Sequence, residues 1–252
     1  MPDNKKIAFI TGGNRGLGLE TARGLGKLGI TVLIGSREQS KGEAAAQSLR
    51  NEGIASVESV KFDVANRADH AGIATLLDKR FGKLDILVNN AGVMVEEADF
   101  GAPGGFNTTA TVPESALRQT FDTNFFAAVA LTQKLLPLIR KSSAGRIVNL
   151  SSILGSLTLQ ADPSSPIYGA KAFAYDASKT ALNAFTVHLA AALKDTPIKV
   201  NSAHPGWVKT DMGGPAAQLE ISEGGKTSVQ LATLDADGPT GGFFHLGKPL
   251  PW

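Results

Sequence analysis

The sequence predicts an α/β protein built on a doubly wound, parallel sheet of about seven strands, arranged as three α/β/α layers. Short β-branched apolar runs alternate with longer stretches of helical periodicity along the whole chain, the pattern of repeated βαβ units. A glycine-rich turn follows the first apolar run and leads directly into the first helical stretch. Neither a linker-like composition nor an internal repeat interrupts this order, so residues 1–252 are expected to form one domain.

Each element follows from its local pattern. A proline- and glycine-rich turn precedes residues 241–246, which are expected to be a seventh strand. The six earlier strands are expected at residues 7–11, 31–35, 57–62, 86–89, 147–150 and 199–203. The helices between them are expected at residues 16–28, 41–51, 68–81, 114–141 (with a break near Pro137) and 175–193.

Composition excludes several classes of function. Lys and Arg exceed Asp and Glu only by 25 to 23, so no basic field favours nucleic acid. The chain has no cysteine, which excludes disulfides and thiolate sites and suits a reducing compartment. Its four histidines show no metal-ligand spacing, and no metal is expected. No apolar run suits a signal or a membrane span, so we expect a cytoplasmic protein.

The turn after the first strand has the composition of a phosphate-binding loop. Its glycines allow a sharp turn and a close approach of the backbone to a pyrophosphate, which the positive end of the following helix attracts. Glycines in such a turn can also serve packing alone, and the spacing GxxxGxG differs from the GxGxxG fingerprint. The loop contributes Gly12, Asn14, Arg15, Gly16, Leu17 and Gly18.

Together with this loop, four further motifs resemble the short-chain dehydrogenase/reductase family, whose loop reads TGxxxGxG. They are Asn89-Asn90-Ala91-Gly92, Asn124, Ser151-Ser152, and Tyr175 with Lys179. The resemblance covers essentially the whole chain in the family's order, and it implies a Rossmann-type fold and a nicotinamide cofactor. The stretches NRGLG, FDTNFFA, LTQKLLPLI and LGKPLPW are similar to the carbonyl reductase branch.

The end of the second strand predicts which cofactor is used, because an acidic residue there binds a ribose hydroxyl and a basic one a 2′-phosphate. Arg37 and Ser36 suit the phosphate, and Arg15 could reach it from the glycine-rich loop. Glu38 leaves NAD(H) open, and Arg37 could be only a solvated charge. We expect NADP(H).

The resemblance implies further cofactor contacts after the later strands. Asp63 and Val64 would bind adenine, although Asp63 could instead form an Asx turn. Asn90, Ala91 and Gly92 would allow the central strand to approach the cofactor. Pro205 and Gly206 would pass beneath the nicotinamide, and Val208 and Thr210 would hold its carboxamide, whereas His204 is interpreted as a packed side chain.

The chain's only two tyrosines are each followed by a lysine, and spacing distinguishes the two pairs. A phenol with a pKa of about 10 needs a nearby cation to act as an acid and base near neutral pH. Tyr175 and Lys179 are four positions apart within a helical pattern and share a face. Tyr168 and Lys171 lie among prolines and glycines, so we interpret Tyr168 as a loop aromatic that packs over the pocket.

The resemblance assigns the catalytic roles. Tyr175 would be the general acid in reduction, Lys179 would lower its pKa and bind the nicotinamide ribose, Ser152 would polarise the substrate oxygen, and Asn124 would hold a relay water. Ser152 and Tyr175 are further apart than in many members of the family. The intervening insertion leaves it open whether the protein is a monomer or a homo-oligomer.

These observations predict an NADP(H)-dependent oxidoreductase that acts on a ketone or aldehyde, or on a secondary alcohol. The substrate pocket is expected between the insertion and the long loops 93–112 and 211–228, whose apolar residues favour a hydrophobic small molecule. An NAD(H)-preferring dehydrogenase and a non-catalytic NADP(H)-sensing regulator remain alternatives. Enoyl reduction is disfavoured because that branch places its lysine seven positions after the tyrosine, where this chain has Leu182.

Overall fold

A computed structural model describes residues 5–96 and 108–252. Within them, eight strands form one sheet in the order β3-β2-β1-β4-β5-β6-β7-β8. All neighbours are parallel except β7 and β8, which form an antiparallel pair. The strands are β1 (Ile7–Thr11), β2 (Thr31–Ser36), β3 (Val57–Lys61), β4 (Ile86–Asn89), β5 (Arg146–Leu150), β6 (Lys199–Ala203), β7 (Phe243–His245) and β8 (Lys248–Pro249).

This sheet confirms the doubly wound α/β class, and all seven expected strands are present. The eighth, β8, was not expected, because it has two residues and includes a proline, which is tolerated at a sheet edge. The strand order reverses between β1 and β4, so the chain leaves these two neighbours in opposite directions. In doubly wound sheets the crevice at this reversal is where ligands bind.

The helices differ from the expected ones at one break and in stretches that were expected to be loops. The expected helix 114–141 is broken at a π-helical turn, Asp122–Phe126, whereas Pro137 lies inside α5. The short helices α6, α8 and α9 lie in stretches without clear periodicity and were not expected. The helices are α1 (Gly16–Lys27), α2 (Gln39–Asn51), α3 (Arg67–Phe81), α4 (Glu114–Phe121), α5 (Ala127–Ile139), α6 (Leu157–Ala161), α7 (Phe173–Ala192), α8 (Ile221–Gly224) and α9 (Lys226–Ala232).

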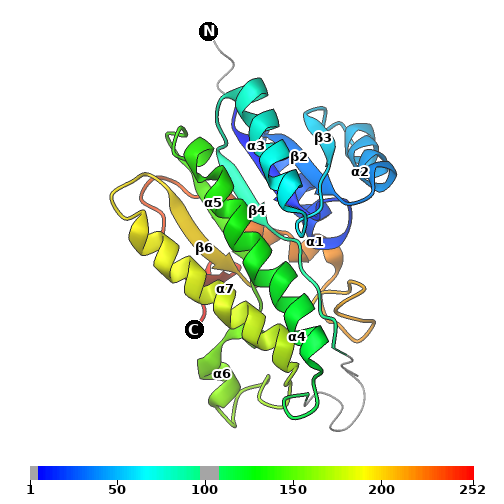
Figure 1. The fold of residues 1–252 in the computed structure, drawn as a ribbon, viewed down its shortest axis with the longest axis vertical. Helices are drawn as coiled ribbons and strands as arrows, with labels where there is room; N and C mark the ends of the chain where they lie inside the picture. The colour runs from blue at the N-terminus through cyan, green and yellow to red at the C-terminus, as the bar shows by residue number, and fades with distance from the viewer. Residues whose placement is uncertain (1–4, 97–107) are drawn as a thin grey trace.

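Two buried cores lie on opposite faces of the sheet because successive strand residues point to opposite sides. Phe9 packs with apolar residues of α3, α5 and α7, whereas its neighbours Ala8 and Ile10 pack with α1, α2 and α9. Figure 1 shows α5 and α7 running side by side along one face. Continuous apolar strands are typical of a sheet that is covered on both faces.

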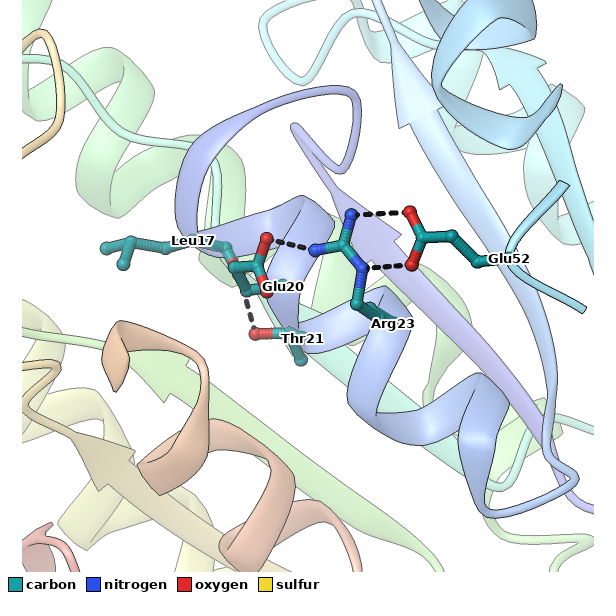
Figure 2. Close-up of polar contacts among 5 residues, drawn as sticks. All are labelled: Leu17, Glu20, Thr21, Arg23 and Glu52. Atoms are coloured by element: carbon teal, nitrogen blue, oxygen red, sulfur yellow. Dashed lines mark hydrogen bonds and ion pairs between the residues drawn. The ribbon is translucent and has the colours of Figure 1, made fainter. Parts of the chain in front are cut away.

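The helix that follows the glycine-rich loop, α1, is tied to the end of α2 by an ion-pair cluster (Figure 2). Arg23 donates to both carboxylate oxygens of Glu52, at 2.6 Å from Nε and 3.0 Å from Nη2, and it also pairs with Glu20 one turn earlier. The hydrogen bond to Glu52 raises the pKa of Arg23, and the same contact lowers the pKa of Glu52. The cluster therefore holds α1 against α2.

None of the helices within residues 5–96 and 108–252 is both long and apolar enough to cross a lipid bilayer.

Candidate active site

A cleft of about 840 Å³ opens at the carboxyl ends of the central strands, where the strand order reverses. Sixteen of the residues predicted from the sequence line it, and they come from the loops and helices that follow six different strands. They are Gly12, Asn14, Arg15, Gly16, Leu17, Gly18, Arg37, Asp63, Val64, Asn90, Ala91, Gly92, Tyr175, Lys179, Pro205 and Thr210.

The loop between β1 and α1 has the geometry expected for a pyrophosphate site. Gly12 and Gly16 have φ angles of 63° and 54°, which side chains rarely adopt. A Cβ atom on Gly18 would lie 2.5 Å from the carbonyl oxygen of Gly12, so only glycine fits there. The first turn of α1 contains no acidic residue. Arg15 occupies the N-cap position, but within the described residues its side chain accepts no hydrogen bond from the helix. The N–H groups of this turn therefore suit an anionic ligand such as a dinucleotide pyrophosphate.

Asn90, just after β4, supports this loop. Its Nδ2 donates to the carbonyl oxygens of Thr11 at 2.8 Å and Gly12 at 3.1 Å. The Thr11 hydroxyl in turn accepts from the backbone N–H groups of Asn90 and Ala91. Asn90 thus acts on the glycine-rich loop as a scaffold and also lines the cleft.

Arg37, after β2, lines the cleft with an exposed guanidinium that forms no ion pair within the described residues. Glu38 pairs instead with Lys41 at 2.7 Å. Ser36 is buried and outside the cleft lining, and its hydroxyl donates to the carbonyl oxygen of Glu38 at 2.9 Å. Arg37 is therefore available to a phosphate at this position, whereas the Ser36 hydroxyl is already engaged.

Arg15, on the glycine-rich loop, forms an ion pair with Asp211, in the loop after β6. Both side chains are largely exposed, so water screens the pair. Its guanidinium remains close to the cleft, which both residues line.

Asp63 both lines the cleft and forms the Asx turn considered from the sequence. Its Oδ1 accepts from the backbone N–H of Ala65 at 3.0 Å, and Asn66, not Asp63, caps α3. The two interpretations of Asp63 are compatible, because one carboxylate oxygen makes the turn and another remains available.

Tyr175 and Lys179 project from one face of α7, with the lysine Nζ 5.5 Å from the centre of the tyrosine ring. Burial raises the pKa of Tyr175 to about 12. A hydrogen bond from the side chain of Ser152 acts in the opposite direction and lowers this pKa. Burial also lowers the pKa of Lys179 to about 8. Lys179 Nζ donates to the carbonyl oxygen of Leu150 at 2.8 Å, which fixes it at the end of β5.

Asn124 lies in the π-helical turn between α4 and α5, a distortion often found at functional sites. Its Oδ1 accepts from the Val93 N–H and its Nδ2 donates to the Val93 carbonyl oxygen, both at 2.8 Å. Its Nδ2 also donates to the Ser178 hydroxyl at 3.0 Å. A Cβ atom added to Gly92 would lie 3.3 Å from Asn124 Oδ1 and 3.4 Å from Lys179 Nζ, so these two groups converge on Gly92.

The second pair, Tyr168 and Lys171, is separate from this centre. Tyr168 is 44% exposed and is not part of the cleft lining. Lys171 Nζ lies 4.8 Å from the centre of its ring and donates to the carbonyl oxygen of Gln160 at 2.7 Å. Tyr168 is therefore an exposed loop aromatic, and it does not lie over the cleft.

The loop after β6 turns at Gly206, whose φ angle is 90°. Gly206 and Val208 are not among the residues that line the cleft, and the Val208 carbonyl oxygen accepts from the Thr210 N–H at 2.7 Å. His204 is a packed residue: its Nδ1 accepts from the Ile153 N–H at 3.2 Å. Burial lowers the pKa of His204 to about 3, which keeps the ring neutral.

Sequence reasoning missed much of the outer wall of the cleft. Met212 and Ile221 come from the expected loop 211–228, but α4 and its π-helical turn were expected only as helix. No local pattern distinguishes a helical residue that faces a cleft from one that faces water. The missed residues are Gly35, Phe62, Ala65, Ser115, Arg118, Gln119, Asp122, Thr123, Leu150, Ser151 and Lys209. Most of the expected loop 93–112 lies outside the described residues.

Comparisons with known proteins agree with this geometry. A model of the family described as short chain dehydrogenase matches residues 6–220. The (+)-neomenthol dehydrogenase of Capsicum annuum is 31% identical over 95% of each chain. Human carbonyl reductase [NADPH] 1 is 33% identical over 100% of each chain. The structure of an NADPH-bound carbonyl reductase from chicken fatty liver superposes with a TM-score of 0.81 at 26% identity, covering 98% of this chain and 99% of that one.

The fold and the cleft therefore define an oxidoreductase with a Rossmann-type sheet. The chain belongs to the short-chain dehydrogenase/reductase family and is of the carbonyl reductase type.

Proposed function

We propose that the protein is an NADP(H)-dependent carbonyl reductase that transfers a hydride to a ketone or aldehyde and runs the reverse reaction on a secondary alcohol. The observation that carries the proposal is the grouping of Tyr175 and Lys179, which line the cleft, with Ser152, whose side chain hydrogen-bonds Tyr175. These side chains supply a proton donor, a cation and a second hydroxyl around one point.

A nicotinamide held in the cleft would supply the hydride, and the residues of this chain would bind and protonate the oxygen of the substrate. Ser152 would donate a hydrogen bond to the carbonyl oxygen and polarise it. Tyr175 would give its phenolic proton to the same oxygen as negative charge develops there. Lys179 would stabilise the tyrosinate that remains and hold the ribose hydroxyls.

The protonation states favour reduction near neutral pH. Burial holds the pKa of Tyr175 at about 12, so its phenol carries the proton that reduction consumes. We expected Lys179 to lower this pKa, but in the protein alone burial is the largest influence on it. Oxidation would require Tyr175 to lose its proton first, which is unfavourable at neutral pH.

Two observations support NADP(H) rather than NAD(H). Arg37 offers an exposed guanidinium after β2 that has no ion-pair partner in the described part of the chain, while Glu38, the acidic alternative, pairs with Lys41. The names of human carbonyl reductase [NADPH] 1 and of the chicken structure specify NADPH. A forked guanidinium matches phosphate geometry better than an ammonium group does.

Replacement of Tyr175 tests the reaction. Tyr175→Phe should lower kcat by at least about 10²-fold, because the ring stays and only the proton donor is lost. NADPH oxidation would be followed with 4-nitrobenzaldehyde, menadione and cyclohexanone. Tyr168→Phe is the matched control and should stay within about twofold of the wild type. Full turnover by Tyr175→Phe would disprove the assigned mechanism.

Replacement of Arg37 tests the choice of cofactor. Arg37→Ala should raise the KM for NADPH about tenfold while leaving the KM for NADH within about twofold, because only NADPH carries the 2′-phosphate. Arg37→Lys keeps the charge without the forked guanidinium, so its KM for NADPH should lie between those of the wild type and Arg37→Ala. Equal use of NADH and NADPH by the wild type would contradict the role assigned to Arg37, and a preference for NADH would establish the NAD(H) alternative.

A further inference from the structure

Helix α7 begins at Phe173 with no cap from its own sequence. Ala172, the N-cap residue, has no side chain that can accept a hydrogen bond, and the first bond within the helix is from Asp176 N to the Ala172 carbonyl oxygen, at 2.8 Å. The N–H groups of Phe173, Ala174 and Tyr175 must therefore find acceptors elsewhere, since unsatisfied buried donors are costly.

Two residues remote in sequence supply all three acceptors. Glu96 accepts from Ala174 N at 3.1 Å through Oε2 and from Tyr175 N at 2.8 Å through Oε1. The Thr108 hydroxyl accepts from Phe173 N at 3.0 Å and donates to Glu96 Oε2 at 2.6 Å. Glu96 and Thr108 are 6% and 9% exposed, respectively.

Glu96 follows β4, and neither Glu96 nor Thr108 is among the residues that line the cleft. The carboxylate also lies where the helix dipole favours negative charge. A capping residue is normally part of its own helix. Here the cap comes from another segment and bonds directly to the backbone of the residue that the proposed function makes the proton donor.

We propose that Glu96, oriented by Thr108, is a positioning residue that fixes the start of α7 and so sets where the Tyr175 phenol meets the substrate oxygen. The inference rests on the proposed role of Tyr175. Glu96 does not line the cleft and acts through the backbone of Tyr175. Small displacements of a proton donor are costly because proton transfer depends on geometry.

Glu96→Gln is the sharpest variant, because it keeps the shape but replaces one acceptor oxygen with an N–H donor that faces another donor. It should lower kcat about 10- to 100-fold and leave the KM for NADPH within about twofold. Thr108→Val should act in the same direction, and Thr108→Ser, which keeps the hydroxyl, should restore the rate. Glu58→Gln, on β3 and paired with Arg80, is the matched control and should behave as the wild type.

A second readout does not require turnover. In a Tyr168→Phe background Tyr175 is the only tyrosine, so tyrosinate absorbance near 295 nm titrates it alone. Loosening the first turn of α7 would admit water, so Glu96→Gln should lower the pKa of Tyr175 toward the ordinary value of about 10. Thermal unfolding of each variant would verify that it is folded.

The outcomes separate the two proposals. If Tyr175→Phe loses turnover while Glu96→Gln keeps a kcat within about twofold of the wild type, the reductase proposal stands and the inference about Glu96 is overturned. If the wild type reduces no carbonyl compound, the reductase proposal fails, and the titration of Tyr175 then tests the positioning role of Glu96 alone. A lowered Tyr175 pKa would then support the positioning role, and an unchanged one would overturn it.

Discussion

At the scale of single residues, the region around Tyr175 combines groups whose pKa values burial moves in opposite directions. Burial lowers the pKa of Lys179 to about 8 and raises that of Tyr175 to about 12. Asp176 adds to this balance, because its charge would raise the pKa of Tyr175 further.

Asp176 is buried next to the catalytic candidate, and its Oδ1 has no hydrogen-bond partner within the described residues. Burial, with the nearby charge of Glu96, raises the pKa of Asp176 to about 8, whereas Lys171 and a hydrogen bond from Gln160 act in the opposite direction. The folded protein thus holds a proton that the unfolded chain releases near pH 4. The stability that this proton contributes is present below pH 4 and is lost as the pH rises through about 8.

Asp176→Asn should remove this pH dependence. Between pH 5 and 8 the free energy of unfolding of the variant should improve relative to the wild type, by up to about 1.4 kcal/mol per pH unit. Urea unfolding at several pH values would measure it. Asp237→Asn, which changes an exposed aspartate, controls for the substitution itself. Parallel curves for Asp176→Asn and the wild type would contradict the prediction.

The tyrosine pairs show how far residue patterns alone can go. Spacing and helical context distinguished Tyr175 with Lys179 from Tyr168 with Lys171, and the structure places only the first pair in the cleft. Glu96 could not be found in this way. Its hydrogen bonds join residues almost eighty positions apart, and no periodicity connects them.

At the scale of elements, the segments that carry the site combine regular structure with local departures from it. The glycine-rich loop, the π-helical turn around Asn124 and the start of α7 capped by Glu96 all deviate from ideal helix or loop geometry. Strongly periodic helices and apolar strands were predictable. The π-helical turn was not, because its residues keep helical composition.

Glycine positions in two helices should respond in opposite ways to the same change. Gly18→Ala, in the first turn of α1, should destabilise the fold by about 1–3 kcal/mol and weaken NADPH binding, because the Cβ meets the Gly12 backbone. Gly72→Ala, exposed in α3 with nothing within 4 Å of the new Cβ, should stabilise by about 0.5–1 kcal/mol. Chemical unfolding and NADPH fluorescence titration would measure both. Equal stability effects would refute the steric account of Gly18.

At the scale of the whole molecule, the order of the strands creates the cleft. Because β4 lies beside β1 on the side away from β2, the loops after these strands diverge and leave a crevice between them. The loops after β5 and β6 then bring Ser152, Thr210 and the start of the insertion toward the same edge. Residues from across the chain meet there because parallel strands end on one side.

The sequence by itself determined the α/β class, the seven main strands and most of the glycine-rich loop, because these depend on local periodicity and on glycine geometry. Only the tertiary structure decided that Ser36 is buried outside the cleft lining, that α4 forms part of the cleft wall and that Glu96 caps the helix of Tyr175. Each of these depends on which segments pack together, and packing between distant segments leaves no periodic trace in the chain.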